Sequence, residues 1–255
     1  MVTAPRRAAG FYDPRTYDWE VGDSADRVRR RRFYVQQTAA AGARVLELGC
    51  GTGDVSLAVA DRGAAVVGLD ISADMLAAAR AKGVSRGASP WWVRADMEAF
   101  AFRTRFHAVI VPYHALFHVL CRDVLAALLR RIHDHLEPGG ILLADVSTRI
   151  PGSRAGSCRT TVTATPDGAY QVTATENFDA ASRRLSTQFD YRLELPEGGT
   201  DTWTRELEYL ITEQEELVEL SRQAGFSTVM AFAAFDADSA IVPGQDAVLR
   251  AERHG

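Results

Sequence analysis

Three alternating glycines and a later aspartate are the residues of this chain best suited to binding a ligand. Gly49, Gly51 and Gly53 follow the apolar run Val45–Leu48, and glycine lets the backbone turn sharply and approach a ligand closely. Asp70 ends a second apolar run about 20 residues later, where a carboxylate can accept hydrogen bonds from both ribose hydroxyls of a nucleoside. The pattern predicts a nucleoside site at one edge of a sheet.

An acidic residue inside the first apolar run bears on which nucleoside binds. Glu47 lies two residues before Gly49, and a carboxylate beside the turn repels a pyrophosphate but suits a ligand with an ammonium group. The dinucleotide fingerprint also places its third glycine one position later, where this chain has Asp54. Both features disfavour a nicotinamide dinucleotide, which is the alternative ligand for such a turn.

A second set of reactive side chains, Tyr113, His114 and His118, follows the apolar stretch 106–112. Because the two histidines are four residues apart, they would share a face if the segment were helical. The ordinary pKa of histidine suits accepting a proton from a nucleophile. The alternative is that each histidine only organises the turn, and Tyr113 is better suited to lining a pocket than to acting as a base. No carboxylate completes a metal-binding motif, so we expect no metal.

The elements that would position these residues alternate between strand and helix. Periodicity predicts helices at 24–41, 54–62, 73–82 and 122–136, and strands at 43–48, 65–70, 91–94, 106–112 and 140–147. Such alternation predicts a parallel sheet with helices on both faces. Ligands of these sheets bind beyond the carboxyl ends of the strands, and both sets of residues follow strand ends.

The pattern changes after Pro151. Period-two alternation predicts antiparallel strands at 159–165, 170–178, 185–195 and 202–210, with a hairpin turn at 166–168. A helix at 213–223 and strands at 227–235 and 247–252 follow. We therefore predict an α/β fold, a doubly wound seven-stranded Rossmann-like sheet with an antiparallel β insertion. Its parts are an N-terminal arm (1–22), the main domain (23–149 and 211–255) and the insertion (150–210).

Composition limits the partners of the chain. Its 255 residues are 47% hydrophobic and 24% charged, with a net charge of −4, so we expect one large domain and no nucleic-acid partner. The arginine run Arg29–Arg32, beside Arg27, is expected to be a solvated helix face. Three scattered cysteines indicate a reducing compartment, and no apolar run approaches the ~20 residues of a membrane span. We expect a cytoplasmic protein. An alternative role for the β insertion is an oligomer interface, so a homodimer is one of the alternatives.

Four stretches, in order, resemble the motifs of the class I S-adenosylmethionine-dependent methyltransferases. Val45–Gly53 resembles the first motif, and Arg94–Met97, Phe106–Pro112 and Leu136–Asp145 resemble later ones. Several small-molecule members of this family, including amino-sugar N-methyltransferases, have a β insertion that roofs the acceptor pocket. The resemblance implies S-adenosyl-L-methionine as cofactor and a small-molecule acceptor. The Asn-Pro-Pro-Tyr sequence of nucleic-acid amino methyltransferases is absent.

The resemblance also implies roles for individual residues. The glycine turn would pack against the methionine part of the cofactor, Asp70 would hold the ribose, and Asp96 would contact the adenine. The residues implied to bind cofactor are Tyr17, Glu47, Gly49, Cys50, Gly51, Gly53, Asp70, Ile71, Met75, Asp96, Met97 and Pro112, and the catalytic candidates are Tyr113, His114 and His118.

The expected reaction is methyl transfer to a nitrogen or oxygen of a small molecule, and natural-product biosynthesis is its expected setting. The alternatives are a non-methylating member of the fold, either a cofactor-binding scaffold or a cyclase, and an NAD(P)-dependent reductase.

Overall fold

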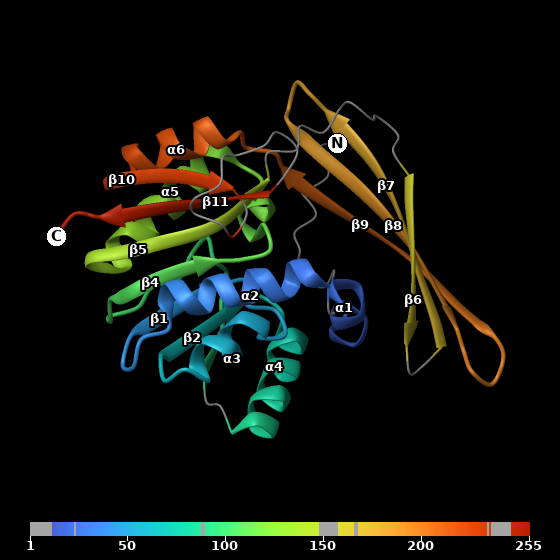
Figure 1. Cartoon of the computed structure of the whole chain (residues 1–255). Helices are drawn as coiled ribbons and strands as arrows, with labels where there is room; N and C mark the ends of the chain where they lie inside the picture. Colours follow the sequence, from blue (N-terminus) through green and yellow to red (C-terminus); the bar gives the residue numbers. More distant parts are fainter. Residues whose placement is uncertain are drawn as a thin grey trace.

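The computed structural model describes residues 12–22, 24–87, 90–147, 158–165, 168–233, 235 and 246–255. These residues form a seven-stranded sheet of order β10-β11-β5-β4-β1-β2-β3 and a separate four-stranded sheet (Figure 1). In the larger sheet, β1 to β5 pair in parallel, whereas β11 is antiparallel to both β5 and β10. Its strands are β1 (Arg44–Leu48), β2 (Ala65–Asp70), β3 (Trp91–Arg94), β4 (Phe106–Val111), β5 (Leu136–Ser147), β10 (Phe226–Ala233) and β11 (Asp246–Arg253). The predicted fold class is confirmed.

Helices cover both faces of this sheet. On one face α5 (Arg122–His135) and α6 (Gln214–Gln223) pack their leucines against the strands. On the other face α2 (Ala25–Thr38) and α3 (Asp54–Ala60) pack through Phe33, Tyr34 and two valines of α3. The helix α4 (Ala73–Arg86) lies beside β2 and β3 (Figure 1). The sheet is therefore buried on both sides, which explains its continuous apolar strands.

Two strands each present one acid to the α2–α3 face. In β1, Leu46 and Leu48 belong to the α5–α6 side of the core and Val45 to the other side. Because side chains alternate along a strand, Glu47 points with Val45 toward α3. The same alternation in β5 places Asp145 on the α2 side. Glu47 is 2% exposed and Asp145 is fully buried, so both carboxyl groups need partners within the protein.

The four-stranded sheet is antiparallel, in the order β6-β7-β8-β9, and consists of β6 (Cys158–Thr165), β7 (Gly168–Asp179), β8 (Arg184–Glu194) and β9 (Thr200–Leu210). Its inner face carries buried Tyr170 and Tyr191, and the ring of Tyr191 stacks on Trp203 across the strands. Its outer face is largely exposed. The four predicted strands are confirmed, whereas residues 166 and 167 of the predicted turn lie outside the described residues.

The N-terminal segment and α2 differ most from expectation. Within the predicted arm, Pro14–Val21 form the helix α1, which lies between α2 and the smaller sheet (Figure 1). In α2, Arg30 is only 8% exposed and is ion-paired with Asp145, and Arg27 is ion-paired with Asp54. The prediction of a solvated arginine face is therefore wrong for these two arginines, because acids distant in sequence pair with them.

Candidate functional site

A cavity opens where β1, β2, β3 and β4 end. It encloses about 850 Å³, part of which is open to solvent. It contains eleven of the predicted site residues, namely Tyr17, Gly49, Gly51, Asp70, Ile71, Met75, Asp96, Met97, Pro112, Tyr113 and His118. Its other lining residues are Tyr12, Leu69, Ser72, Ala95, Glu98 and Ala115. The structure thus brings together side chains from both sets that the sequence singled out, whereas Glu47, Cys50, Gly53 and His114 are not part of this lining.

The glycine turn is held by Asp70. One carboxylate oxygen of Asp70 accepts the Gly51 N–H at 2.8 Å, and the other accepts the Ser72 N–H at 2.8 Å. Burial raises the pKa of Asp70, and the two backbone hydrogen bonds oppose this shift. Gly51 has φ +53, and a Cβ there would lie 3.3 Å from Met75. The turn therefore keeps its backbone exposed to the cavity and fixes the Asp70 carboxylate beside it.

Gly53 and Cys50 face the protein rather than the cavity. A Cβ on Gly53 would lie 2.6 Å from the ring of Trp92, and one on Gly68 would lie 2.5 Å from the same ring and 3.0 Å from the Cys50 sulfur. Burial raises the pKa of the Cys50 thiol well above its usual value. Packing against Trp92 thus requires glycine at residue 53, whereas the Cys50 sulfur packs beside Gly68. The raised pKa means that Cys50 is not an activated nucleophile.

Glu47 lies behind the turn. It shares a hydrogen bond with Ser56 of α3, and burial raises its pKa to about 8. The folded protein therefore holds this group largely in its neutral form at pH 7. Because Glu47 does not line the cavity and its side chain bonds Ser56, we expect it not to contact a ligand bound there directly.

The Glu47→Gln variant tests this protonation state. Between pH 4.5 and 8 the unfolded chain releases the Glu47 proton that the folded protein retains, so this group lowers stability as pH rises. Glutamine is always neutral, so we expect the variant to gain on the order of 4 kcal/mol over the native protein at pH 8 and little at pH 4.5. Urea unfolding at both pH values measures the difference. A constant difference would contradict the raised pKa.

The segment after β4 is a strained turn, not an α-helix. Tyr113 and His114 both have positive φ, at 56° and 58°, and a short 3₁₀ helix, η1 (Ala115–His118), follows. The His114 ring stacks on Phe117, and His118 alone of the two histidines lines the cavity. The expectation of a helical face shared by both histidines is therefore not met.

His118 lies between the cavity and the smaller sheet. Its Nε2 is 3.3 Å from the Tyr12 hydroxyl, and its ring centroid is 5.2 Å from that of Tyr209 on β9. Burial, with the nearby His114, lowers the pKa of His118 to about 4. In the described part of the chain its Nδ1 is buried and has no hydrogen-bond partner. His118 is thus a neutral imidazole with an unused polar atom, which is a feature of ligand sites.

Tyr113 is a hydrogen-bond donor rather than a base. Its hydroxyl donates to Asp54 at 2.9 Å, and burial, followed by the charge of Asp54, raises its pKa far above the usual value for tyrosine. A protonated phenol at every physiological pH cannot take a proton from a nucleophile.

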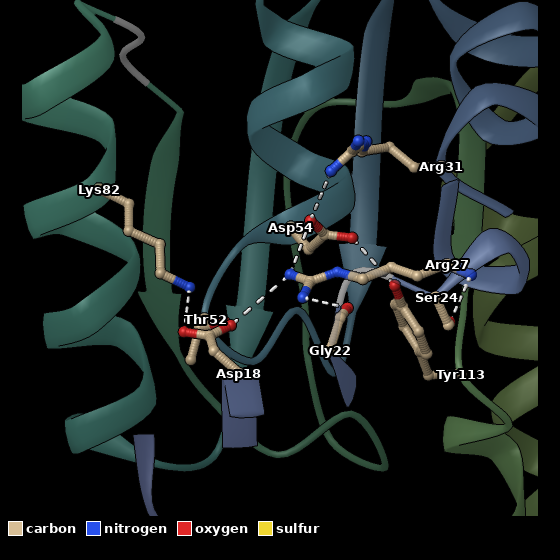
Figure 2. Close-up of polar contacts among 9 residues, drawn as sticks. All are labelled: Asp18, Gly22, Ser24, Arg27, Arg31, Thr52, Asp54, Lys82 and Tyr113. Carbon is tan, nitrogen blue, oxygen red and sulfur yellow. Dashed lines mark hydrogen bonds and ion pairs between the residues drawn. The ribbon is translucent and has the colours of Figure 1, made fainter. Parts of the chain in front are cut away.

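Helix α1 closes one side of the cavity and is held by polar contacts (Figure 2). Asp18 accepts hydrogen bonds from Thr52 beside the glycine turn at 3.0 Å and from Lys82 of α4 at 2.6 Å. Tyr17, on the same helix, lines the cavity, as does Tyr12 just before it. The contact of Tyr12 with His118 joins residues 106 positions apart, so periodicity along the chain does not predict it.

Comparison with known proteins shows which family part of this chain resembles and which solved structures share its fold. Residues 45–140 match the family profile described as a methyltransferase domain. A solved S-adenosylmethionine-dependent methyltransferase from Clostridium acetobutylicum superposes with a TM-score of 0.80 at 15% identity, covering 94% of this chain and 97% of that one. Residues 45–140 are therefore similar to a methyltransferase domain, and the chain has the same fold as this solved S-adenosylmethionine-dependent methyltransferase.

Two curated relatives are similar in sequence to more than half of this chain. The cypemycin N-terminal methyltransferase of a Streptomyces species is 33% identical over 58% of this chain and 60% of the relative. The dTDP-3-amino-3,6-dideoxy-α-D-glucopyranose N,N-dimethyltransferase of Streptomyces fradiae is 33% identical over 51% of this chain and 46% of the relative. The aligned part of the chain thus spans less than two thirds of the length of these relatives.

Two further observations concern membrane-spanning helices and metal sites. No helix in the described ranges is long and apolar enough to span a membrane. Among those same residues, no group of three or more His, Cys, Asp or Glu side chains is placed to hold a metal ion.

Proposed function

We propose that this protein is an S-adenosylmethionine-dependent methyltransferase that acts on a nitrogen or oxygen of a small molecule. The charge of the cavity is the observation that supports this most directly. The described lining contains three carboxyl side chains, Asp70, Asp96 and Glu98, and neither lysine nor arginine. A cofactor with a sulfonium and an ammonium group complements this lining, whereas the two phosphates of a dinucleotide would be repelled.

The glycine turn supports the same choice. A phosphate would need free backbone N–H groups at the turn and at the start of the following helix. Here the Gly51 N–H is already donated to Asp70, and Asp54 occupies the first position of α3. The turn therefore fits an uncharged or cationic part of a ligand better than an anion.

The chain's own residues would hold and shield the cofactor. Asp70 would accept hydrogen bonds from the ribose hydroxyls, and the loop Ala95–Glu98 would contact the adenine. Tyr17 and Tyr113, which both line the cavity, would exclude water from it. When bound, S-adenosylmethionine would supply an electrophilic methyl group: the lone pair of the acceptor atom forms the new bond to the methyl carbon, and the electrons of the broken carbon–sulfur bond stay on sulfur, which leaves as the neutral thioether. Alignment and exclusion of water then account for most of the remaining acceleration.

His118 would bind the acceptor. Its neutral ring, with a buried and unpartnered Nδ1, can exchange a hydrogen bond with an amine or hydroxyl beside the cavity. Tyr209 of the smaller sheet contacts the same ring, which supports a role for the β insertion in covering the acceptor pocket. One relative reported above is named an N,N-dimethyltransferase of an amino sugar and the other an N-terminal methyltransferase. Amines are therefore the first acceptors to test, among them amino sugars and natural-product intermediates.

Calorimetry with S-adenosylmethionine, and with NADH and NADPH as matched nucleotides, tests the cofactor. We expect the methyl donor to bind with a dissociation constant between about 1 µM and 1 mM, and neither dinucleotide to bind. No binding of the methyl donor at millimolar concentration would overturn the proposal, and binding of a dinucleotide alone would indicate a reductase.

A panel of amines and hydroxyl compounds then tests the reaction, with S-adenosylhomocysteine and methylated product measured by mass spectrometry. Release of both products is the expected result. Conversion of a panel compound without S-adenosylhomocysteine would instead indicate a cyclase or another non-methylating reaction.

A further inference from the structure

We infer that Arg30 of α2 and Asp145 of β5 are positioning residues that fix Tyr113 in the cavity wall. The consequence for turnover depends on the function proposed above, whereas the consequence for the Tyr113 backbone does not. Neither residue is part of the cavity lining, so both would act through Tyr113.

The backbone at Tyr113 requires support. Two consecutive non-glycine residues, Tyr113 and His114, lie in the left-handed region, which residues with side chains populate sparsely because it is strained. Such conformations persist only where the surrounding structure fixes them. The turn also precedes η1, so its geometry sets the position of His118.

Tyr113 is held at both ends by acids. Its backbone N–H donates to Asp145 Oδ2 at 2.8 Å, and its hydroxyl donates to Asp54 Oδ2 at 2.9 Å. Asp145 also accepts the Tyr34 hydroxyl at 2.5 Å. The main chain and the tip of Tyr113 are therefore each bound to a separate carboxylate, one from β5 and one from α3.

Arginines from one face of α2 neutralise both acids. Arg30 Nε lies 2.9 Å from Asp145 Oδ2. Arg27 and Arg31 lie 3.0 Å and 3.3 Å from Asp54 Oδ1 (Figure 2). Positions 27, 30 and 31 have the i, i+3 and i+4 spacing that places side chains on one helical face. These three arginines thus stabilise the two acids, since buried carboxylates need compensating charge.

Arg30 also touches Tyr113 directly. Its guanidinium carbon lies 4.5 Å from the centroid of the Tyr113 ring, within the range of a cation–π contact. Arg30 therefore contacts the ring of Tyr113 while it pairs with the acid that binds the Tyr113 N–H. Removing Arg30 leaves Asp145, which is fully buried, without its compensating cation. The hydrogen bond to the Tyr113 backbone should then weaken, and the cavity wall should become mobile.

The test compares Arg30→Met and Arg30→Lys with Arg29→Met as matched control. Arg29 is adjacent in sequence, is 66% exposed at its side chain and pairs with exposed Asp26, so its loss removes the same charge without touching Tyr113. Hydrogen exchange followed by mass spectrometry reports on the segment 112–118 in the absence of cofactor. Steady-state kinetics and calorimetry with S-adenosylhomocysteine report kcat and affinity separately.

In Arg30→Met we expect exchange of this segment to accelerate about tenfold or more. We expect kcat to fall about tenfold, with less than a threefold change in affinity. Arg30→Lys, which keeps the charge and loses the planar fork, should show about a third of these effects, and Arg29→Met none. If Arg30→Met does not fold, the exchange and kcat of Arg30→Lys test the inference in its place.

The inference would be overturned if a folded Arg30 variant showed the same hydrogen exchange at residues 112–118 and the same kcat as the native protein. If the native protein shows no methyl transfer, the proposed function fails, and the exchange measurement still decides whether Arg30 holds the turn.

Discussion

Asp70→Ala is expected to weaken the binding of S-adenosylmethionine and S-adenosylhomocysteine by about 100-fold or more. In the proposed site, two ribose hydroxyls would lose their acceptor, and each hydrogen bond to a buried carboxylate contributes roughly 1–3 kcal/mol, where 1.4 kcal/mol is tenfold in affinity. The carboxylate also organises the Gly51 and Ser72 amides, so its loss affects the turn as well. Isothermal titration calorimetry measures the effect.

Two further variants make this result interpretable. Asp74→Ala removes the same charge four residues away, at an exposed position on α4, and should bind normally. Asp70→Asn keeps one acceptor oxygen, and we expect it to bind more tightly than the alanine variant and more weakly than the native protein. Native affinity in Asp70→Ala would exclude this residue from the cofactor site.

His118→Ala should lower kcat by about 100-fold or more, the range of a group that exchanges a hydrogen bond or proton with the reacting atom. The affinity for S-adenosylhomocysteine should change only a few fold, because the imidazole is expected to face the acceptor. Stopped-time assays with saturating cofactor measure kcat. His107→Ala is the control, since His107 lies at the opposite end of β4, at the start of the strand. Undiminished turnover in His118→Ala would assign this side chain to a structural role.

The pH dependence gives an independent check on His118. Because burial and the nearby His114 lower its pKa to about 4, the ring is neutral from pH 5 upward. The rate should therefore fall only as pH decreases toward 4, with no step near 6.5 from this residue. The same shift affects stability, since between pH 4 and 6.5 the unfolded chain binds the proton that folded His118 does not. This contribution to stability rises with pH across that window.

The architecture was predictable from local patterns. Periods of two and of about 3.6 residues located the strands and helices, and the glycine turn with Asp70 located the cavity, because parallel strands bring their carboxyl ends to one edge. Individual contacts across the fold were not predictable in this way. The pairs Tyr34–Asp145 and Arg27–Asp54 join residues 111 and 27 positions apart, and periodicity alone does not reveal such partners.

Because local patterns do not reveal contacts across the fold, the positions of two predicted site residues, Glu47 and His114, differ from expectation. Glu47 was expected beside the ligand because it is close to the turn in sequence, but strand alternation directs it toward Ser56. His114 was expected to share a face with His118, but a left-handed backbone at residues 113 and 114 breaks the helix. The cytoplasmic location, the homodimer, the absence of a nucleic-acid partner and the domain boundaries stay predictions.

The packing of Trp92 has a consequence for how this protein can vary. One indole ring occupies the space that side chains at residues 53 and 68 would fill. These three sites therefore form a single steric unit, and a larger residue at either glycine becomes acceptable only after the aromatic ring has been replaced by something smaller. Among natural variants, such changes should occur together, and a chain that retains the tryptophan should also retain both glycines.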